Sequence, residues 1–213
     1  MPTLRYVQKI SLKEARFIAK EIIGIDRNFK PVIEKSGPAP IGQAQSKVSN
    51  FHALAESILS QQLSIKAADT IVARVKSLAG GRLSAEGISK LNDRQLRSAG
   101  CSGAKSRALR ELSQATLDKS LPMRNLHRLT DEEISGSLLP LFGIGRWTVE
   151  MFLIFQLGRL DIWPVGDLGV RRGWEKLHRL REEITPAELE IKGDKFAPYR
   201  SHVAWYCWRA LEN

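Results

Sequence analysis

The feature that most constrains this chain is a pair of glycines, Gly143 and Gly145, on either side of a single isoleucine. Glycine adopts positive φ at no steric cost, so the pair suits a tight turn between two helices. In the first turn of a following helix, backbone N–H groups have no intrahelical acceptor and point outward with the positive end of the helix dipole. With no Cβ in the turn, a phosphate oxygen can approach this backbone closely. An ordinary corner between two helices is the alternative, and the pattern alone does not exclude it.

Helices are expected on both sides of the turn. Thr130 and Glu133 have the spacing of a capping box, which predicts a helix that begins at this point and stops at Gly143. A second helix is predicted from about residue 146 to 157, with Gly158 placed to end it. The stretch is therefore predicted to form a helix, a tight hairpin and a second helix.

An aspartate, Asp167, stands twenty positions after Trp147. It follows the residues Trp-Pro-Val-Gly at 163–166 and precedes a predicted helix at 168–180, so it lies at or near a helix N-cap. Capping is the usual role of an aspartate at such a position. The second interpretation is a carboxylate that the helix N-terminus keeps ionised beside a cleft, where it can stabilise positive charge.

Capping residues and apolar residues at helical spacing recur along the chain, and no segment has a convincing strand pattern. A capping box at Ser11 predicts a helix that Gly24 ends. Ser49 and Ser64 are expected to cap two further helices, separated by a break at 60–63. The second of these is expected to turn one apolar face inward, at Ile65, Ala68, Ile71, Val72, Val75 and Leu78. The expected class is all-α, with about nine or ten helices.

The net charge of +10 and the pI of about 9.9 favour a polyanionic partner such as nucleic acid, although a merely basic soluble protein is the alternative. No run of 18 apolar residues is present, so no transmembrane helix is expected, and the N-terminus lacks the apolar segment of a secretory signal. Cys101 and Cys207 are too few for a four-cysteine zinc or iron–sulfur site. We expect two free thiols in a reducing compartment, and no metal site.

The run from Gly143 to Thr148 (GIGRWT), together with Asp167 in a Pro-Val-Gly-Asp loop, resembles the helix-hairpin-helix DNA glycosylase superfamily. Within that superfamily, the chain is most similar to the alkylbase branch of the DNA-3-methyladenine glycosylase II type. Two further stretches fit, 51–64 (FHALAESILSQQLS) and 196–208 (FAPYRSHVAWYCW). The resemblance covers residues 45–210 approximately.

The resemblance implies an all-α fold with two lobes. A central helical lobe that contains the helix-hairpin-helix motif is expected at 50–157. A second helical lobe, formed by 1–49 and 158–213, is expected to carry the loop with the catalytic Asp167. This loop would lie at the cleft between the lobes, where ligand sites often occur.

The same resemblance assigns roles to individual residues. Asp167 is the expected catalytic residue, and Gln62 is the expected intercalating residue, with Leu63 as the second choice. Aromatic residues at helical spacing more often belong to the core, and basic residues more often form a solvated face. The candidates for the base pocket are Trp147, Trp208, Trp205 and Phe51. The candidates for phosphate binding are Gly143, Gly145, Arg146, Thr148, Lys105 and Arg171.

An enzyme that excises a base must first flip it out of the stack. Cleavage then passes through an oxocarbenium-like state, which one anionic carboxylate stabilises while it orients or deprotonates water. N3- and N7-alkylated purines already carry positive charge, so Asp167 is enough without a general acid. Relatives often carry an acidic residue where this chain has Gly166 and an aromatic residue where it has Met151. Bifunctional relatives carry a nucleophilic lysine where this chain has Trp147, which implies a monofunctional enzyme.

The expected function is therefore that of a monofunctional glycosylase of base excision repair, which removes 3-methyladenine and 7-methylguanine and has no AP lyase activity. The expected partner is double-stranded DNA with alkylated bases, and the chain is expected to be a monomer with no membrane contact. No cofactor is expected beyond a Na⁺ or K⁺ ion that the hairpin carbonyls can hold. The expected location is the bacterial cytoplasm, at the nucleoid, or the nucleus of a eukaryotic cell. The alternatives are a noncatalytic damaged-DNA-binding module of this fold and a glycosylase for another lesion, such as hypoxanthine or ethenoadenine.

Overall fold

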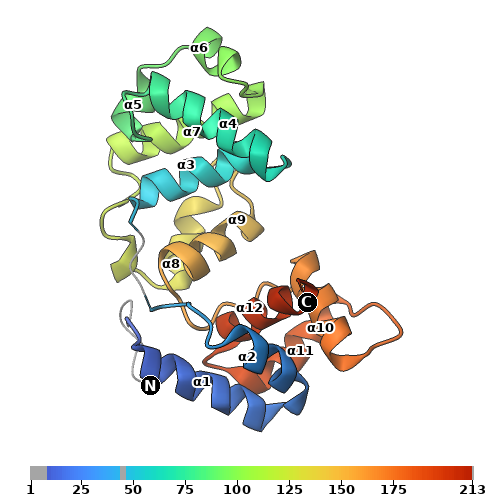
Figure 1. Ribbon diagram of the computed structural model, residues 1–213. Coiled ribbons are helices and arrows are strands. Elements are labelled where there is room, and N and C mark those ends of the chain that lie inside the picture. The colour runs from blue at the N-terminus through green and yellow to red at the C-terminus, as the bar shows by residue number, and fades with distance from the viewer. Residues whose placement is uncertain (1–8, 44–46, 213) are drawn as a thin grey trace. The chain divides into compact units, whose positions relative to one another are not determined.

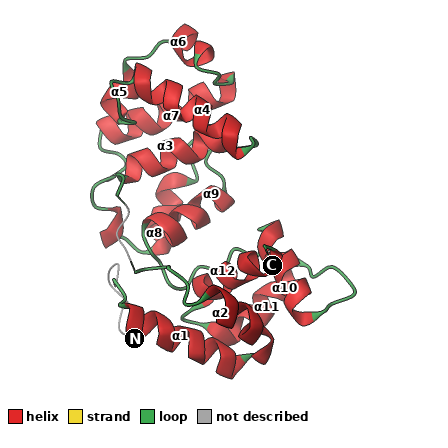
Figure 2. Ribbon diagram, in the orientation of Figure 1, coloured by secondary structure: helices red, strands yellow, loops and turns green. Residues whose placement is uncertain are grey.

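The structure is a computed structural model that describes residues 9–43 and 47–212. These residues form twelve α-helices with short 3₁₀ and π segments between them, and they contain no strand (Figure 2). The all-α prediction is confirmed. There are more helices than the nine or ten that were expected. Short helices such as α2 (Lys30–Ser36) and α5 (Ala85–Ser89) contain too few residues to show a helical repeat of apolar positions. Within the described ranges, no helix is long and apolar enough to cross a membrane.

The chain divides into two compact units. Among the described residues, the first unit consists of 47–152, and the second consists of 9–43 and 153–212. The expected lobes, 50–157 and the remainder, place the boundary later in the chain. The division falls within a helical segment, because α9 (Arg146–Met151) is followed directly by the π-helix η3 (Phe152–Gln156).

The first unit is built around α7 (Gly103–Leu117) and α3 (Asn50–Ser60), which pack against each other. Helix α5 also packs on α7, and α4 (Ile65–Leu78) packs on α3 (Figure 1). The inward faces of α3 and α7 are fully buried, at Leu54, Ile58, Leu59, Leu109 and Leu112. The other α-helices of this unit are α6 (Asp93–Ser98), α8 (Asp131–Leu138) and α9.

Side-chain caps begin these helices at the predicted residues. Ser49 and Ser64 each accept a hydrogen bond from the backbone N–H three positions later. Thr130 and Glu133 form the predicted reciprocal capping box at the start of α8. Each cap satisfies an N–H group that the helix itself cannot pair, so the local sequence fixes where the helix begins.

The end of α8 and the buried face of α4 differ from the prediction. Helix α8 stops at Leu138 instead of Gly143, because Pro140 has no N–H with which to continue the helical hydrogen bonds. On α4, only Ala68 and Val75 are buried, and Ile65 is 82% exposed. Helix α4 makes its main helix contact with α3 alone, so a narrow stripe is covered instead of a full face.

Two other helices also depart from the expected bounds. Helix α1 (Leu12–Ile25) continues through Gly24, and Asp26 follows it as the cap of the short 3₁₀ helix η1 (Arg27–Phe29). The helix after the hairpin changes to π geometry at residue 152 instead of continuing as a regular α-helix to 157. Single turns of π-helix inside a helical run are frequent at functional sites.

The second unit is organised around the contact between α10 (Leu168–His178) and α12 (Arg200–Leu211). These helices approach so closely that a Cβ at Gly173 would collide with the backbone of Cys207. Three aromatic side chains meet edge to face in the core of this unit, Phe29, Trp174 and Phe196. The remaining helices of this unit are α1, η1, α2, α11 (Pro186–Gly193) and η4 (Asp194–Phe196).

Asp26 is a largely buried carboxylate that joins three segments of the second unit. The Nε2 atom of His178 and the Nζ atom of Lys195 each lie 3.0 Å from Asp26 Oδ2, and the N–H of Asn28 donates to Oδ1. Burial by itself raises the pKa of Asp26, but these hydrogen bonds together outweigh it and lower the pKa to about 2.

The lowered pKa of Asp26 makes stability depend on pH in acid. A carboxylate with a lowered folded-state pKa contributes fully above its unfolded pKa, and the contribution is lost as the pH falls through the folded pKa. We expect Asp26→Asn to lower the free energy of unfolding at neutral pH by about 2 kcal/mol. Below about pH 4 the parent should lose this advantage, so the two proteins converge towards pH 2. Urea unfolding at several pH values measures this convergence.

His202 supplies an internal control for that measurement. Its side chain is fully buried, and burial lowers the pKa of His202 to about 4. Stability should therefore fall between about pH 6.5 and 4 in the parent and in Asp26→Asn alike. Two proteins that differ by a constant amount from pH 4 to pH 2 would contradict the role given to Asp26.

Candidate functional site

The two glycines of the hairpin have different conformations and different surroundings. Gly143 has the predicted positive φ of +80°, whereas Gly145 is extended at −92° and is the N-cap of α9. A Cβ at Gly143 would lie 2.7 Å from the Cβ of Ala108 on α7, while nothing lies within 4 Å of a Cβ at Gly145. Gly143 therefore makes the turn and lets it pack on α7. The open approach to the backbone is at Gly145, and only one of the two glycines needs positive φ.

Helix α7 also supports the hairpin through a charged pair. The N–H of Phe142 donates to Glu111 Oε2 at 2.9 Å, and Arg107 Nε donates to Glu111 Oε1 at 2.9 Å. The guanidinium of Arg107 lies 4.0 Å from the centre of the Phe142 ring. The hydrogen bond from Phe142 is the largest cause that lowers the pKa of Glu111, so this carboxylate remains ionised against the turn.

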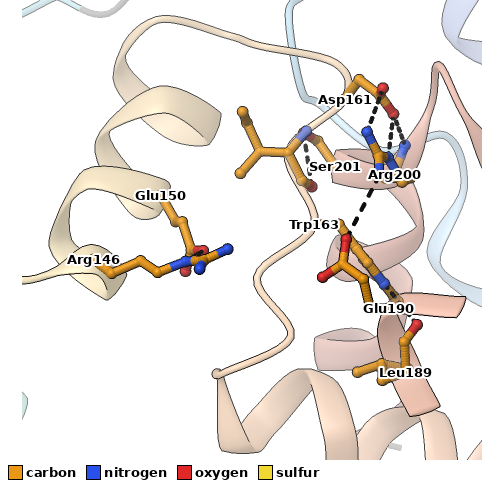
Figure 3. Close-up of polar contacts among 9 residues, drawn as sticks. Arg146, Glu150, Asp161, Trp163, Leu189, Glu190, Arg200 and Ser201 are labelled. Atoms are coloured by element: carbon orange, nitrogen blue, oxygen red, sulfur yellow. Dashed lines mark hydrogen bonds and ion pairs between the residues drawn. The ribbon is translucent and has the colours of Figure 1, made fainter. Parts of the chain in front are cut away.

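The predicted phosphate contacts of the first unit separate into exposed and internal groups. The side chain of Arg146 is 76% exposed and pairs with Glu150 at 2.9 Å (Figure 3). Lys105 instead donates from Nζ to the carbonyl of Leu59 at 2.7 Å, at the C-terminal end of α3. The side chain of Thr148 is buried. Lys105 and Thr148 thus have contacts inside the first unit, and their role in phosphate binding stays a prediction.

The turn between α3 and α4 carries the predicted intercalating residues. Gln62 is exposed and has φ of +56°, an unusual value for a residue with a side chain. Leu63 is 40% exposed, and Ile65, the first residue of α4, is the most exposed large apolar residue in the described chain at 82%. The turn therefore presents one amide and two apolar side chains to the surroundings. Ile65 was assigned to the inward face of α4 by its spacing, and that assignment is wrong.

Asp167 is the N-cap of α10, as its position before the helix predicted. Its Oδ1 atom accepts a hydrogen bond from the N–H of Val170 at 2.7 Å and a second one from Nε1 of Trp208 at 2.9 Å. This oxygen therefore has two N–H donors, one from the first turn of α10 and one from an indole of α12. The capping interpretation is confirmed, and the interpretation as a carboxylate that stabilises positive charge stays a prediction.

Gly169, which is not among the site residues predicted from the sequence, allows the indole of Trp208 to reach Asp167. A Cβ at Gly169 would lie 2.8 Å from Trp208 Cδ1 and 3.0 Å from Asp167 Oδ1. Distances under 3.0 Å are closer than real Cβ contacts, so the indole would have to move. The spacing of Gly169 and Gly173 was the available signal, since small residues four apart lie on one face of a helix.

The loop that leads to Asp167 is anchored at several points. Arg200, at the start of α12, donates from Nε and Nη2 to the two carboxylate oxygens of Asp161, each at 2.8 Å (Figure 3). The indole of Trp163 donates to the carbonyl of Leu189 at 2.9 Å. The N–H of Ile162 donates to Ser201 Oγ at 2.9 Å. These bonds connect the loop to α11 and α12, which fixes the backbone that precedes the N-cap.

The predicted base-pocket aromatics have different environments. Trp208 lies beside Phe155, with ring centres 5.6 Å apart and planes at 33°. Phe155 belongs to the π-helix and is 53% exposed, and it is not among the aromatics predicted from the sequence, which indicated a regular helix at this point. Trp147 on α9 is 49% exposed. Phe51 is only 4% exposed and belongs to the core of the first unit.

The other predicted site residues of the second unit have contacts of their own. Trp205 lies edge-on to Tyr206 with ring centres 5.1 Å apart, and the guanidinium of Arg209 lies 5.6 Å from the centre of its ring. Arg171 is half-buried, and its Nη1 approaches the carbonyl of Ile184 at 3.5 Å. None of the hydrogen bonds and ring contacts described above joins Trp205 or Arg171 to the pair formed by Asp167 and Trp208.

The described residues contain no cluster of three or more His, Cys, Asp or Glu side chains that could hold a metal ion. Cys101 and Cys207 are both buried and unbridged. Burial raises the pKa of the Cys207 thiol, and the nearby charge of Asp167 raises it further. This thiol is therefore held neutral beside the carboxylate.

The chain matches the family model of the HhH-GPD superfamily of base excision DNA repair proteins over residues 55–198. It is 35% identical to DNA-3-methyladenine glycosylase 1 of Schizosaccharomyces pombe, over 87% of this chain and 83% of that protein. The solved structure of the S. pombe 3-methyladenine DNA glycosylase Mag1 in complex with abasic DNA is similar at a TM-score of 0.80 and 34% identity, covering 90% of this chain and 94% of that one.

A DNA-3-methyladenine glycosidase of Bacillus halodurans is similar in structure at a TM-score of 0.80 and 36% identity, covering 91% of this chain and 88% of that one. The family model thus matches more than half of the chain, and relatives above 30% identity are covered over more than two thirds of their length. The chain belongs to the HhH-GPD superfamily of base excision DNA repair proteins.

Proposed function

We propose that this protein is a monofunctional DNA glycosylase of base excision repair that removes alkylated purines from double-stranded DNA. Relatives named 3-methyladenine DNA glycosylase, one of them solved with abasic DNA, support the reaction class and the DNA partner. The observation that carries the proposal is Asp167, a carboxylate at the N-terminus of α10 whose Oδ1 accepts from Val170 and Trp208. A protein that only bound DNA would gain nothing from a fixed anion facing an anionic ligand.

The reaction breaks the bond between the sugar and the damaged base. Positive charge develops on the sugar as the bond lengthens, and the fixed carboxylate of Asp167 stabilises that charge without having to reorganise. The carboxylate also orients or deprotonates the water that attacks the sugar. An N3- or N7-alkylated purine carries positive charge before cleavage and leaves as a neutral base, so no second catalytic group is needed.

Phe155 and Trp208 are the aromatic surfaces that suit the flipped base. Both lie in the second unit near Asp167, and Phe155 is half exposed. A cationic alkylated base is attracted to the electron-rich face of such rings. Selectivity for alkylated over ordinary purines follows from this attraction and from the better leaving group.

The proposal includes three finer statements about the enzyme. It is of the DNA-3-methyladenine glycosylase II type, it acts as a monomer, and it lacks lyase activity, because Trp147 stands where a lyase needs an amine. The exposed Arg146 and the open backbone at Gly145 contribute to binding a DNA phosphate. A monovalent cation on the carbonyls of the hairpin is compatible with this role.

The carboxylate is tested by Asp167→Asn. Asparagine also caps helices, and its side-chain oxygen can accept both hydrogen bonds, so the variant removes charge and little else. We expect excision of 3-methyladenine from duplex DNA under single turnover to slow by roughly 10²–10³, as when one group that stabilises transition-state charge is removed. The free energy of unfolding should change by about 1 kcal/mol or less, and binding to abasic-site DNA should persist. A folded variant with the parent's rate would favour the noncatalytic DNA-binding module.

The position of the indole is tested by Gly169→Ala. The added methyl group displaces Trp208 from Asp167, and small misplacements at a reacting centre are costly, so excision should slow by roughly 10- to 100-fold. Gly166→Ala is the matched control in the same loop, because a Cβ at Gly166 meets nothing within 4 Å. Equal single-turnover rates for the two variants would show that the contact between Trp208 and Asp167 does not matter.

The absence of lyase activity is tested by borohydride trapping. A lyase forms a Schiff base between an amine and the sugar, and borohydride reduces it to a stable protein–DNA adduct. We expect no adduct with lesion-containing DNA, and an abasic product whose strand breaks only after treatment with alkali. An adduct that survives denaturing electrophoresis would refute the monofunctional assignment.

A further inference from the structure

The side chain of Gln61 links two parts of the first unit that are far apart in the sequence. Its Nε2 atom donates to the carbonyl of Gly143 at 3.0 Å, across 82 residues, and lies 3.3 Å from Thr148 Oγ1, across 87 residues. Gly143 is the tight turn of the hairpin, and Thr148 lies in the first turn of α9. One amide therefore spans the hairpin from its turn to the helix that follows.

Both N–H bonds of the Gln61 amide are used in this link. A primary amide nitrogen has two hydrogens, and the two acceptors account for both. The side chain of Thr148 is only 3% exposed, so water cannot easily replace the amide as its partner. A buried hydroxyl that loses its partner is destabilising, which makes the link costly to break.

The residue next to this link is the proposed intercalating residue. Gln62 has φ of +56°, a conformation that costs energy for a residue with a side chain and persists only where neighbours enforce it. Gln61 is fixed to the hairpin on one side of the turn, and Lys105 fixes the carbonyl of Leu59, just before the turn, at 2.7 Å. One side-chain hydrogen bond therefore joins the strained turn to the hairpin, and a second one joins the end of α3, just before the turn, to α7.

We propose that Gln61 is a positioning residue that couples insertion of the turn at Gln62 and Leu63 into DNA to phosphate binding at the hairpin. The inference rests on the proposed function. A DNA phosphate that binds to the hairpin fixes the position of Gly143. Because Gln61 is bonded to Gly143, the turn that inserts into DNA is then held at a set distance from the bound phosphate. The two hydrogen bonds of the Gln61 amide go to protein atoms, so the proposal gives this residue no contact with DNA. Its loss should therefore affect the flipping of a paired base more than binding to the backbone.

The chain offers a matched control on the other side of the hairpin. Glu111 also accepts a hydrogen bond from the turn, from the N–H of Phe142 at 2.9 Å, but it comes from α7 and has no bond to the segment 60–63 among those described above. Glu111→Gln weakens the support of the hairpin without breaking its link to the intercalating turn. Comparison with Gln61 variants separates a loosened hairpin from a lost coupling.

The experiment is a double-mutant cycle on base flipping. Gln61→Leu removes both donors at similar size, and Gln61→Glu keeps the size but cannot donate to Gly143. Each is combined with Gln62→Ala, as is Glu111→Gln, and thermal unfolding confirms that each protein is folded. The first readout is the change in fluorescence of 2-aminopurine, placed opposite or beside an abasic site in the DNA, when the protein binds. The second readout is the rate at which 3-methyladenine is excised from duplex and from single-stranded DNA.

If Gln61 acts as proposed, its variants lower excision from duplex DNA by roughly tenfold, a size usual for coupled residues in one hydrogen-bond network. The loss from single-stranded DNA should stay within about twofold, because no paired base has to be displaced. After Gln62→Ala, the same substitutions should have little further effect, whereas Glu111→Gln should add its full effect. The dependence of binding on salt should not change, because no phosphate contact is removed.

Additive effects of Gln61 and Gln62 variants, or equal losses on duplex and single-stranded DNA, would overturn the coupling. Both Gln61 variants behaving as the parent would overturn it as well. Should the parent excise no base at all, the proposed function fails, but the 2-aminopurine signal still reports on the coupling. Failure of the inference and failure of the proposed function are therefore distinguishable.

Discussion

The proposed chemistry of this protein depends on how closely α10 packs on α12. Two glycines one helical turn apart make this approach possible. Gly173 faces the backbone of Cys207, and Gly169 faces the indole of Trp208, which therefore comes within 2.9 Å of Asp167 Oδ1. Because that oxygen also caps α10, one packing contact fixes the start of a helix, the orientation of an aromatic ring and the position of the proposed catalytic carboxylate.

The hairpin of the first unit is held by the same combination of a small residue and specific polar contacts. Gly143 packs on α7 at Ala108, Glu111 accepts from the turn, and Gln61 donates to it from the α3–α4 turn. Each contact is modest by itself, since a typical hydrogen bond contributes about 1 kcal/mol. Together they leave the turn few alternative positions, and a rigid turn is what binding a phosphate through backbone N–H groups requires.

The π-helix η3 is the element that most changes the view of the site obtained from the sequence. A wider turn changes the direction of the side chains that follow it, and Phe155 is left half exposed beside Trp208. In a regular α-helix the run Met-Phe-Leu-Ile-Phe would simply have been assigned to a buried face. Burial also separates the aromatics that were predicted for the base pocket, because Phe51 belongs to the core whereas Trp147 is half exposed.

The sequence by itself determined the helix starts at Ser49, Ser64 and Thr130, the positive φ of Gly143 and the N-cap at Asp167. These features depend on residues at most four positions apart, so a local pattern carries the whole signal. Only the tertiary structure decided that Trp208 donates to Asp167, that Gln61 reaches Gly143 and that Thr148 is internal. These contacts join segments 41 to 87 residues apart. They form because particular faces of helices pack against each other. The spacing of residues along the chain does not show which faces will pack together.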